Sequence, residues 1–239
     1  MDNRRALSFG TAAAAYDRGR PGYPADALRW LLPETASRVL DLGAGTGKLT
    51  ASLLGLGLPG RTVVAVEPDR DMRVLVDPRA TRLGGTAERI PLAEASVDAV
   101  LVGQAFHWFD PVAALPEVVR VLRPGGVLGL LWNVLDDSAE WVARLCDLWQ
   151  AEDRSSLMAA GNDVPFDGPA SGLSVPVRRV FRHETPVDRL SILDVVSSRS
   201  VIILLPEQER ASVLAKAAAL VPAPAKLPYV CDAWRAVRR

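Results

Sequence analysis

The fold of this chain is decided by one stretch of its sequence, Val39-Leu-Asp-Leu-Gly-Ala-Gly-Thr-Gly47. The stretch begins as a buried strand and ends in three glycines, and a helical pattern follows from Lys48. Glycines allow a sharp turn and let a ligand approach the main chain, and the next helix presents unpaired N–H groups to that ligand. Glu67 ends the following predicted strand, where a carboxylate can accept both hydroxyls of a ribose. These features predict a nucleoside-ligand site at the strand ends.

Three kinds of nucleotide-binding loop are compared with this stretch. A P-loop is excluded because Leu42 stands at the position of its first glycine and Leu49 at that of the Ser/Thr that would hold magnesium. A dinucleotide-binding loop fits poorly, because Lys48 replaces its third glycine and no Tyr-x-x-x-Lys pair occurs. The third pattern, G-x-G-x-G after an acidic residue, matches at every position.

Strand-like and helix-like segments alternate outward from the loop, which predicts an α/β fold: a doubly wound, Rossmann-like, mostly parallel sheet of seven strands. The apolar runs are typical of strands buried on both faces. The expected strands are 38–42, 62–66, 81–85, 97–102, 126–132, 176–185 and 227–237. The expected helices are 24–32, 48–56, 69–76, 189–197 and 206–220, with two further helical patterns around 115–122 and 141–149.

Prolines and glycines indicate where two of these segments begin or end. Pro116 lies inside the pattern Leu115, Val118, Val119, Leu122, so we expect the regular helix to begin there rather than at Asp110-Pro111. The run Arg123-Pro-Gly-Gly126 is expected to end that helix and turn the chain.

We expect a single domain over residues 1–239. Its predicted parts are an N-terminal lid (about 1–34), a core (about 35–135), a small helical cap insertion (about 136–175) and C-terminal strands and helices (about 176–239).

Composition predicts a soluble protein without a basic surface. The chain carries 28 acidic and 28 basic residues, so a nucleic-acid partner is not expected. The first ten residues lack the apolar core of a signal peptide, and no window approaches the about 18 apolar residues of a membrane span. Cys146 and Cys231 lie far apart without a CxxC spacing, which predicts neither a disulfide framework nor a zinc site and favours a cytoplasmic location.

An ordered set of motifs along most of the chain resembles the class I S-adenosylmethionine-dependent methyltransferases, in the branch with ubiquinone-biosynthesis-like and trans-aconitate-like enzymes (the methyltransferase type 11 domain). The motifs are Tyr16-Asp-x-x-Arg-Pro-x-Tyr-Pro24, the glycine loop, Val66-Glu-Pro68, Gly85-Thr-Ala-Glu-x-Ile-Pro-Leu92, Gln104-Ala-Phe-His-Trp-Phe109, Arg120-Val-Leu-Arg-Pro-Gly-Gly126, Ser198-x-Ser200 and Leu227-Pro-Tyr229.

The resemblance implies S-adenosyl-L-methionine as cofactor, S-adenosyl-L-homocysteine as product, and a role for each matching residue. Asp41 would hold the amino group of the cofactor, and Glu67 the ribose hydroxyls. Many relatives have Asp at the position of Thr86, so either Thr86 or Glu88 is left to contact the adenine amino group. The remaining implied cofactor-binding residues are Gly43, Ala44, Gly45 and Gly47 under the methionine part, Pro68, Ala87 at the adenine ring, Gln104 and Ala105 beside the sulfonium, and Tyr16 and Arg20 from the N-terminal lid.

Methyl transfer needs little from side chains, because positioning and exclusion of water supply much of the acceleration. The candidate catalytic residue is His107, which follows the fourth strand and could act as a general base; alternatively it packs within the Phe106–Phe109 aromatic cluster. The candidate acceptor pocket comprises His107, Trp108, Trp132, Ser198 and Ser200. With two histidines in the chain no metal site is expected, and His183 is interpreted as a surface strand residue beside the solvated Arg178, Arg179 and Arg182.

The sequence therefore predicts methyl transfer to a small-molecule acceptor at an oxygen, a nitrogen or a carboxylate, by a monomer or homodimer without membrane association. A nicotinamide-dependent oxidoreductase and a non-catalytic binding protein on the same fold are the alternatives.

Overall fold

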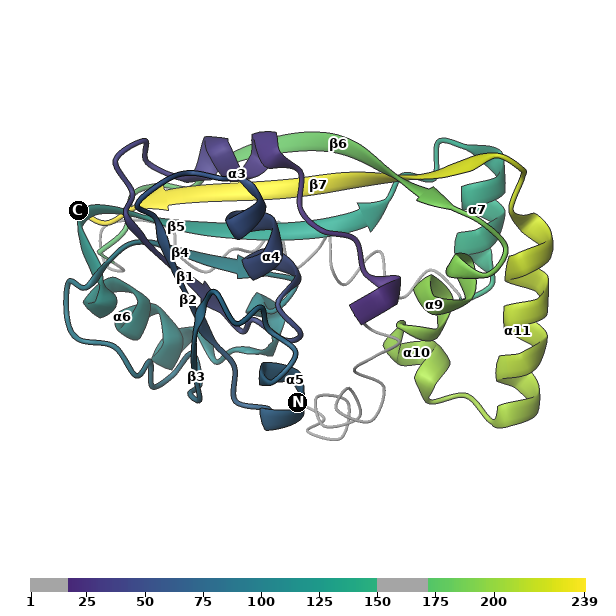
Figure 1. Ribbon diagram of the computed structural model, residues 1–239, viewed down its shortest axis with the longest axis horizontal. Helices are drawn as coiled ribbons and strands as arrows, with labels where there is room; N and C mark the ends of the chain where they lie inside the picture. Colours follow the sequence, from purple (N-terminus) through teal and green to yellow (C-terminus); the bar gives the residue numbers. More distant parts are fainter. Residues whose placement is uncertain (1–16, 150–171) are drawn as a thin grey trace.

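The computed structural model describes residues 17–149 and 172–239, and its centre is one seven-stranded sheet (Figure 1). The strand order is β3-β2-β1-β4-β5-β7-β6. The pairs among β1 to β5 are parallel, and β7 runs antiparallel to both β5 and β6. The strands are β1 (Arg38–Leu42), β2 (Thr62–Val66), β3 (Thr81–Leu83), β4 (Val97–Gly103), β5 (Leu122–Leu135), β6 (Val177–Val187) and β7 (Ala225–Val237). The predicted Rossmann-like, mostly parallel sheet is confirmed.

Helices cover both faces of the parallel strands, which explains their apolar sequences. On one face α3 and α4 bury Leu28 and Leu53 against the sheet. On the other face α6 buries Leu115 and Val118. The helices of this part are α3 (Ala25–Leu31), α4 (Lys48–Gly55), α5 (Arg70–Arg73), the 3-10 helix η1 (Phe106–Trp108) and α6 (Pro111–Val121).

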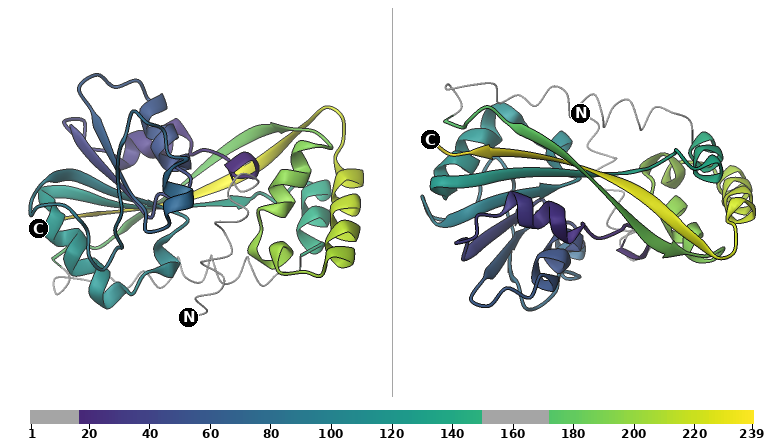
Figure 2. Two further views of the ribbon diagram at one scale, coloured as in Figure 1. Left: turned by 60° about the horizontal axis from the view of Figure 1, so that its bottom comes forward. Right: turned by 90° about the horizontal axis from the view of Figure 1, so that it is seen from above.

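A second group of helices packs around the far ends of β5, β6 and β7, and has its own apolar core, which includes Leu145, Ile192 and Tyr229. The group comprises α7 (Glu140–Asp147), α9 (Ser191–Ser197), α10 (Ser200–Ile203) and α11 (Glu207–Leu220). Figures 1 and 2 show this group standing beyond the parallel part of the sheet, joined to it by the long strands β5, β6 and β7. We call these four helices the cap helices.

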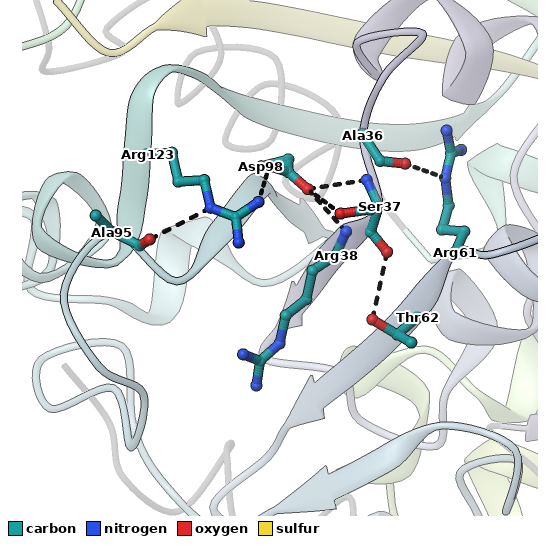
Figure 3. Close-up of polar contacts among 8 residues, drawn as sticks. All are labelled: Ala36, Ser37, Arg38, Arg61, Thr62, Ala95, Asp98 and Arg123. Atoms are coloured by element: carbon teal, nitrogen blue, oxygen red, sulfur yellow. Dashed lines mark hydrogen bonds and ion pairs between the residues drawn. The ribbon is translucent and has the colours of Figure 1, made fainter.

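The amino-terminal edge of the parallel strands is held by Asp98, at the start of β4 (Figure 3). Its Oδ2 accepts hydrogen bonds from the backbone N–H groups of Ser37 and Arg38, at 2.8 Å each, and its Oδ1 pairs with the guanidinium of Arg123. These contacts, more than offsetting burial, lower the pKa of the Asp98 carboxyl. These contacts lie at the edge opposite to the carboxyl-terminal edge, where ligands bind in open α/β sheets.

The prediction that this helix begins at Pro116 is wrong. Helix α6 begins at Pro111, with Asp110 as its N-cap, and Pro116 lies inside it. The Asp110 side chain accepts a hydrogen bond from the N–H of Val112 at 3.0 Å, and Pro111 occupies a first-turn position that needs no donor. This strong start offsets the interior proline.

The predicted turn at Arg123–Gly126 is an irregularity within β5 rather than a break before it. Leu122 pairs with Val97, the next paired residue is Val127, and Gly125 between them has a φ of +77°.

Two parts of the expected organisation fall on residues that the structure does not describe. The start of the N-terminal lid, with Tyr16, lies outside the described residues, as does much of the expected cap insertion, residues 150–171. Among the helices of the described ranges, none is long and apolar enough to span a membrane.

Candidate functional site

The glycine loop lies at the carboxyl end of β1, between β2 and β4, where the strand order reverses. In open α/β sheets this is where ligands bind. The loop is fixed to the neighbouring strand, because the N–H groups of Gly43 and Ala44 both donate to the carbonyl of Val66, at 2.9 and 3.1 Å. Gly43, Gly45 and Gly47 have φ values of +72°, +56° and +93°, in the left-handed region that favours glycine.

Two of these glycines differ in what surrounds them. A Cβ on Gly43 would lie 2.8 Å from the Cβ of Ala105 and 3.2 Å from the ring of Phe109, so this glycine is required by packing. A Cβ on Gly45 would have only the sulfur of Met72 within reach, at 4.0 Å. The backbone at Gly45 therefore borders open space, into which a ligand can approach the main chain.

Two buried carboxylates lie at this loop. Glu67 is 7% exposed, and its two oxygens accept from the N–H groups of Gly45 and Asp69, at 2.8 and 2.9 Å. Asp41 is 1% exposed, and its Oδ2 accepts from the hydroxyl of Thr50 at 2.6 Å. Its Oδ1 is also buried and has no hydrogen-bond partner among the described residues. A buried acceptor without a partner is costly unless something else supplies a donor.

Burial raises the pKa of both carboxyls. The pKa of Asp41 rises to about 7, mainly through burial and to a smaller extent through the charge of Glu67, with the Thr50 hydrogen bond opposing the rise. The pKa of Glu67 is raised by burial, against the two backbone hydrogen bonds. A positive charge placed beside them would lower both pKa values, so the loop is suited to a cationic ligand.

Comparison with known proteins identifies the family. The methyltransferase domain model matches residues 40–130. An uncharacterized methyltransferase of Mycobacterium tuberculosis strain H37Rv is 45% identical over 246 residues, covering 97% of this chain and 96% of its own. A methyltransferase-like protein of Schizosaccharomyces pombe is 34% identical over 216 residues, covering 87% of this chain and 84% of its own. The chain belongs to the class I S-adenosylmethionine-dependent methyltransferases.

A solved structure supports this assignment for the fold. A type II methyltransferase from Anaeromyxobacter dehalogenans superposes with a TM-score of 0.67 and 25% identity, over 92% of this chain and 97% of that one. The residues of the glycine loop also fit the family's cofactor. Gly45 borders open space, the buried Oδ1 of Asp41 receives no hydrogen bond from the described residues, and both carboxylates favour a cation.

Among the predicted cofactor-binding residues, Thr86, Ala87 and Glu88 follow β3, whereas Pro68 follows β2. Ala87 is buried, whereas Thr86 and Pro68 are exposed. Glu88 already forms a hydrogen bond within the protein: its Oε1 accepts from the N–H of Asp110 at 3.0 Å. Glu88 therefore links this segment to the start of α6.

The segment after β4 packs directly against the glycine loop, since a Cβ on Gly43 would lie 2.8 Å from the Cβ of Ala105. Gln104 has a φ of +57°, an uncommon conformation for a side chain of its size, and its Nε2 donates to the carbonyl of Asn133 at 2.7 Å. His107, in η1, is half-buried, with its ring centroid 4.8 Å from that of Trp108, which is exposed. The aromatic packing considered for His107 is thus present.

Of the other predicted acceptor residues, Trp132 lies on β5, whereas Ser198 and Ser200 lie at the cap helices. Trp132 is buried on the α6 face of the sheet, in a core cluster with Phe106. Ser198 ends α9, fully buried, and its hydroxyl donates to the carbonyl of Val195 at 2.7 Å. Ser200 begins α10.

The described N-terminal residues cross between the cap helices and the glycine-loop side of the sheet; we call residues 17–23 the strap. Arg20, which the resemblance placed near the cofactor, donates to the carbonyl of Ser198 at 3.1 Å. Arg18 forms a two-pronged ion pair with Asp194 of α9, at 2.9 and 3.0 Å. On the other side Lys48, the first residue of α4, pairs with Asp17 at 3.2 Å. In Figure 1 the purple start of the described chain lies between α5 and α9.

Three polar residues of this region were not predicted to belong to the site: Thr50, Asn133 and His183. His183 lies on strand β6, as predicted, but its ring is half-buried rather than fully exposed, and its Nε2 lies 3.1 Å from the Oδ1 of Asn133. Thr50 could have been found, because a Thr in the first turn of α4 faces the strand that carries Asp41. Asn133 stands one residue after the predicted end of its strand, and no sequence signal marks it.

Proposed function

We propose that this methyltransferase transfers a methyl group from S-adenosyl-L-methionine to a small-molecule acceptor at an oxygen, a nitrogen or a carboxylate, leaving S-adenosyl-L-homocysteine. The observation that carries the donor side is the pair of buried carboxylates at the glycine loop, with Oδ1 of Asp41 lacking a partner among the described residues. The donor has an ammonium group, a sulfonium and two ribose hydroxyls, which complement Asp41 and Glu67.

In this proposal each end of the loop holds one part of the cofactor. Asp41 receives the ammonium group, and Glu67 accepts the ribose hydroxyls with the lone pairs that Gly45 and Asp69 leave free. The further proposed contacts are Gly43, Ala44 and Gly47 along the methionine part, Pro68, Ala87 and either Thr86 or Glu88 around the adenine, Gln104 and Ala105 beside the sulfonium, and Tyr16 and Arg20 from the N-terminal lid.

The chemistry asked of the chain is positioning. The bound cofactor supplies a methyl group on a good leaving group, and the residues around it orient the acceptor in line and exclude water. The strap supports such enclosure, because it joins the cap helices to the start of α4.

The acceptor side rests on fewer observations. Equal numbers of acidic and basic residues, 28 of each, favour a small molecule over a nucleic acid. We place the acceptor between the segment after β4 and the cap helices, where His107, Trp108, Trp132, Ser198 and Ser200 are its proposed neighbours. A monomeric or homodimeric state and a cytoplasmic location remain predictions from the sequence.

Thermal unfolding with S-adenosyl-homocysteine, S-adenosylmethionine and NAD tests the donor assignment, because a ligand that binds only the native state raises its Tm. We expect both sulfur nucleosides to raise the Tm and NAD to leave it unchanged. Stabilisation by NAD alone would refute the proposal and support a nicotinamide-dependent oxidoreductase.

A pair of glycine variants locates the ligand. Gly45 and Gly57 both have positive φ, +56° and +62°, and a Cβ on either meets no described atom closer than 4.0 Å. Each change to alanine should cost about 1–2 kcal/mol of stability through backbone strain. Gly45→Ala should also abolish the Tm shift given by S-adenosyl-homocysteine, whereas Gly57→Ala should keep it. Equal shifts in the two variants would place the ligand elsewhere.

A further inference from the structure

A line of polar contacts leads from the glycine-loop side of the sheet to β6. The Nε2 of Gln104 donates to the backbone carbonyl of Asn133 at 2.7 Å. The side-chain Nδ2 of Asn133 donates to the carbonyl of Gly22 at 3.0 Å, and its Oδ1 lies 3.1 Å from the Nε2 of His183. The His183 ring stacks on Tyr229, with centroids 5.3 Å apart and planes 19° apart. His183 is thus connected to Gln104 through a single residue, which is itself 5% exposed.

The contacts of Asn133 fix which nitrogen of His183 carries the proton. A backbone carbonyl can only accept, so the amide nitrogen of Asn133 must face Gly22 and its oxygen must face His183. The Nε2 of His183 therefore donates, and in the neutral imidazole Nδ1 holds the lone pair.

The Nδ1 of His183 is open to a ligand. No described residue forms a hydrogen bond to it, and the ring that carries it is half-buried, not fully enclosed. Burial of the ring lowers the pKa of His183, which keeps it neutral near pH 7. An unprotonated, accessible and oriented imidazole nitrogen is what a general base requires.

The charged groups around His183 are engaged with other partners. On its own strand Arg182 pairs with Asp136 at 3.4 Å and Glu184 with Lys226 at 3.3 Å. Among the described residues, Tyr229 of β7 stacks on the ring. Burial raises the pKa of Tyr229, and the charges of Arg199, between α9 and α10, and of Arg20 in the strap oppose the rise.

We propose that His183, held by Asn133 as its positioning residue, is the proton acceptor of the methyl-transfer reaction. The proposal rests on the proposed function. In the step, the acceptor atom forms a bond to the methyl carbon and its proton moves to Nδ1 of His183. The electrons of the broken carbon–sulfur bond stay with the leaving thioether, and the positive charge ends on the imidazolium. The acceptor is then a group that carries a proton, a hydroxyl or an amine, since a carboxylate at neutral pH needs no base. His183 takes the role that the sequence assigned to His107.

Nitrogen-15 NMR of histidine tests the assignment directly, because the chain has two histidines and His107→Gln leaves only the signals of His183. At neutral pH we expect the pattern of a ring protonated at Nε2, with a titration midpoint below the ordinary value. Asn133→Ala should release the ring into a mixture of tautomers. Asn133→Asp should keep the Nε2–H tautomer and raise the midpoint, because a carboxylate stabilises the imidazolium. A ring protonated at Nδ1, or one indifferent to both Asn133 variants, overturns the proposal.

Binding of S-adenosyl-homocysteine separates this inference from the proposed function. We expect His183→Gln to bind the nucleoside with unchanged affinity, and saturation with it to shift the His183 signals of the His107→Gln protein. Absence of binding to the unmodified protein refutes the donor assignment, whereas binding without any His183 shift refutes only the role of His183.

Methyl transfer to phenol, benzylamine and benzoate supplies the kinetic comparison. For phenol or benzylamine we expect His183→Gln to lower kcat at least about 100-fold, and transfer to benzoate to be unaffected. Loss of the phenol and benzylamine reactions in His107→Gln but not in His183→Gln would return the role to His107. Even where none of the three probes is methylated, a ring protonated at Nδ1 or indifferent to both Asn133 variants overturns the proposal.

Discussion

At the scale of single residues, the site is built on a carboxyl group whose ionisation is costly in the folded protein. Asp41 is almost fully buried and one of its oxygens has no described partner, while its pKa rises from 3.8 to about 7. Each pKa unit corresponds to about 1.4 kcal/mol, so ionising Asp41 costs the native state on the order of 4 kcal/mol. A cationic ligand stabilises the ionised carboxylate and recovers part of that energy, which favours the binding of a cation at the loop.

Asp41→Asn should change how stability depends on pH. Between the unfolded pKa and about 7, native Asp41 is protonated while unfolded Asp41 is ionised, so the native state binds more protons and its stability falls as pH rises. The contribution of Asp41 to the free energy of unfolding is fully present below the unfolded pKa and is lost once the pH passes the folded pKa. From about pH 5 to about pH 7.5, the variant should therefore gain about 2–3 kcal/mol relative to the unmodified protein in urea unfolding.

A matched change on the surface controls for this effect. The Asp26 side chain is 83% exposed, so Asp26→Asn should leave the pH dependence as it is. Parallel stability curves for the unmodified protein and Asp41→Asn would mean that Asp41 stays ionised when buried, contrary to the argument above.

At the scale of elements, helix α6 shows how one side chain sets the start of a helix. Asp110 accepts from the N–H of Val112, and its own N–H donates to Glu88. Asp110 thereby joins the helix to the segment predicted to contact the adenine. The start predicted at Pro116 was wrong because the N-cap at Asp110 and the first-turn proline at position 111 favour an earlier start more than the interior proline opposes it.

Asp110→Ala should lower the free energy of unfolding by about 1 kcal/mol, the usual value of an N-cap. Asp110→Asn keeps an oxygen that can accept from Val112 and should restore most of the loss. Urea unfolding of the three proteins checks this. If Asp110→Asn lost as much as Asp110→Ala, the side-chain oxygen would not be the source of the stability.

Elements of the fold were predictable wherever neighbours in sequence decide the structure. Strands β1 and β2 follow from short apolar runs with clear ends, and the meeting of Asp41, Glu67 and Gln104 follows from parallel strands ending at one edge. Contacts between distant segments were not predictable. His183 stands among exposed arginines in sequence, and only the pairing of β6 with β7, and of β7 with β5, brings it to Asn133.

At the scale of the whole molecule, the strap connects the two groups of helices. Arg18 and Arg20 contact α9 and its end, while Asp17 pairs with Lys48 and the N–H of Tyr23 donates to Ser52 of α4. In the proposed site the donor binds at the glycine loop and the acceptor lies toward the cap helices. The strap contacts both, so it should influence the distance between donor and acceptor.

Gly19→Ala should loosen this connection. A Cβ on Gly19 would lie 2.1 Å from the backbone carbonyl oxygen of Asp194, which cannot move without distorting α9. We expect the strap to separate from α9, tryptic cleavage after Arg18 to accelerate, and affinity for S-adenosyl-homocysteine to fall about tenfold, equal to about 1.4 kcal/mol. Gly55→Ala is the control: its Cβ meets nothing within 4 Å at the end of α4, so affinity and cleavage should be unchanged. Faster cleavage of Gly19→Ala with unchanged affinity would show that the strap joins the two parts without enclosing the ligand.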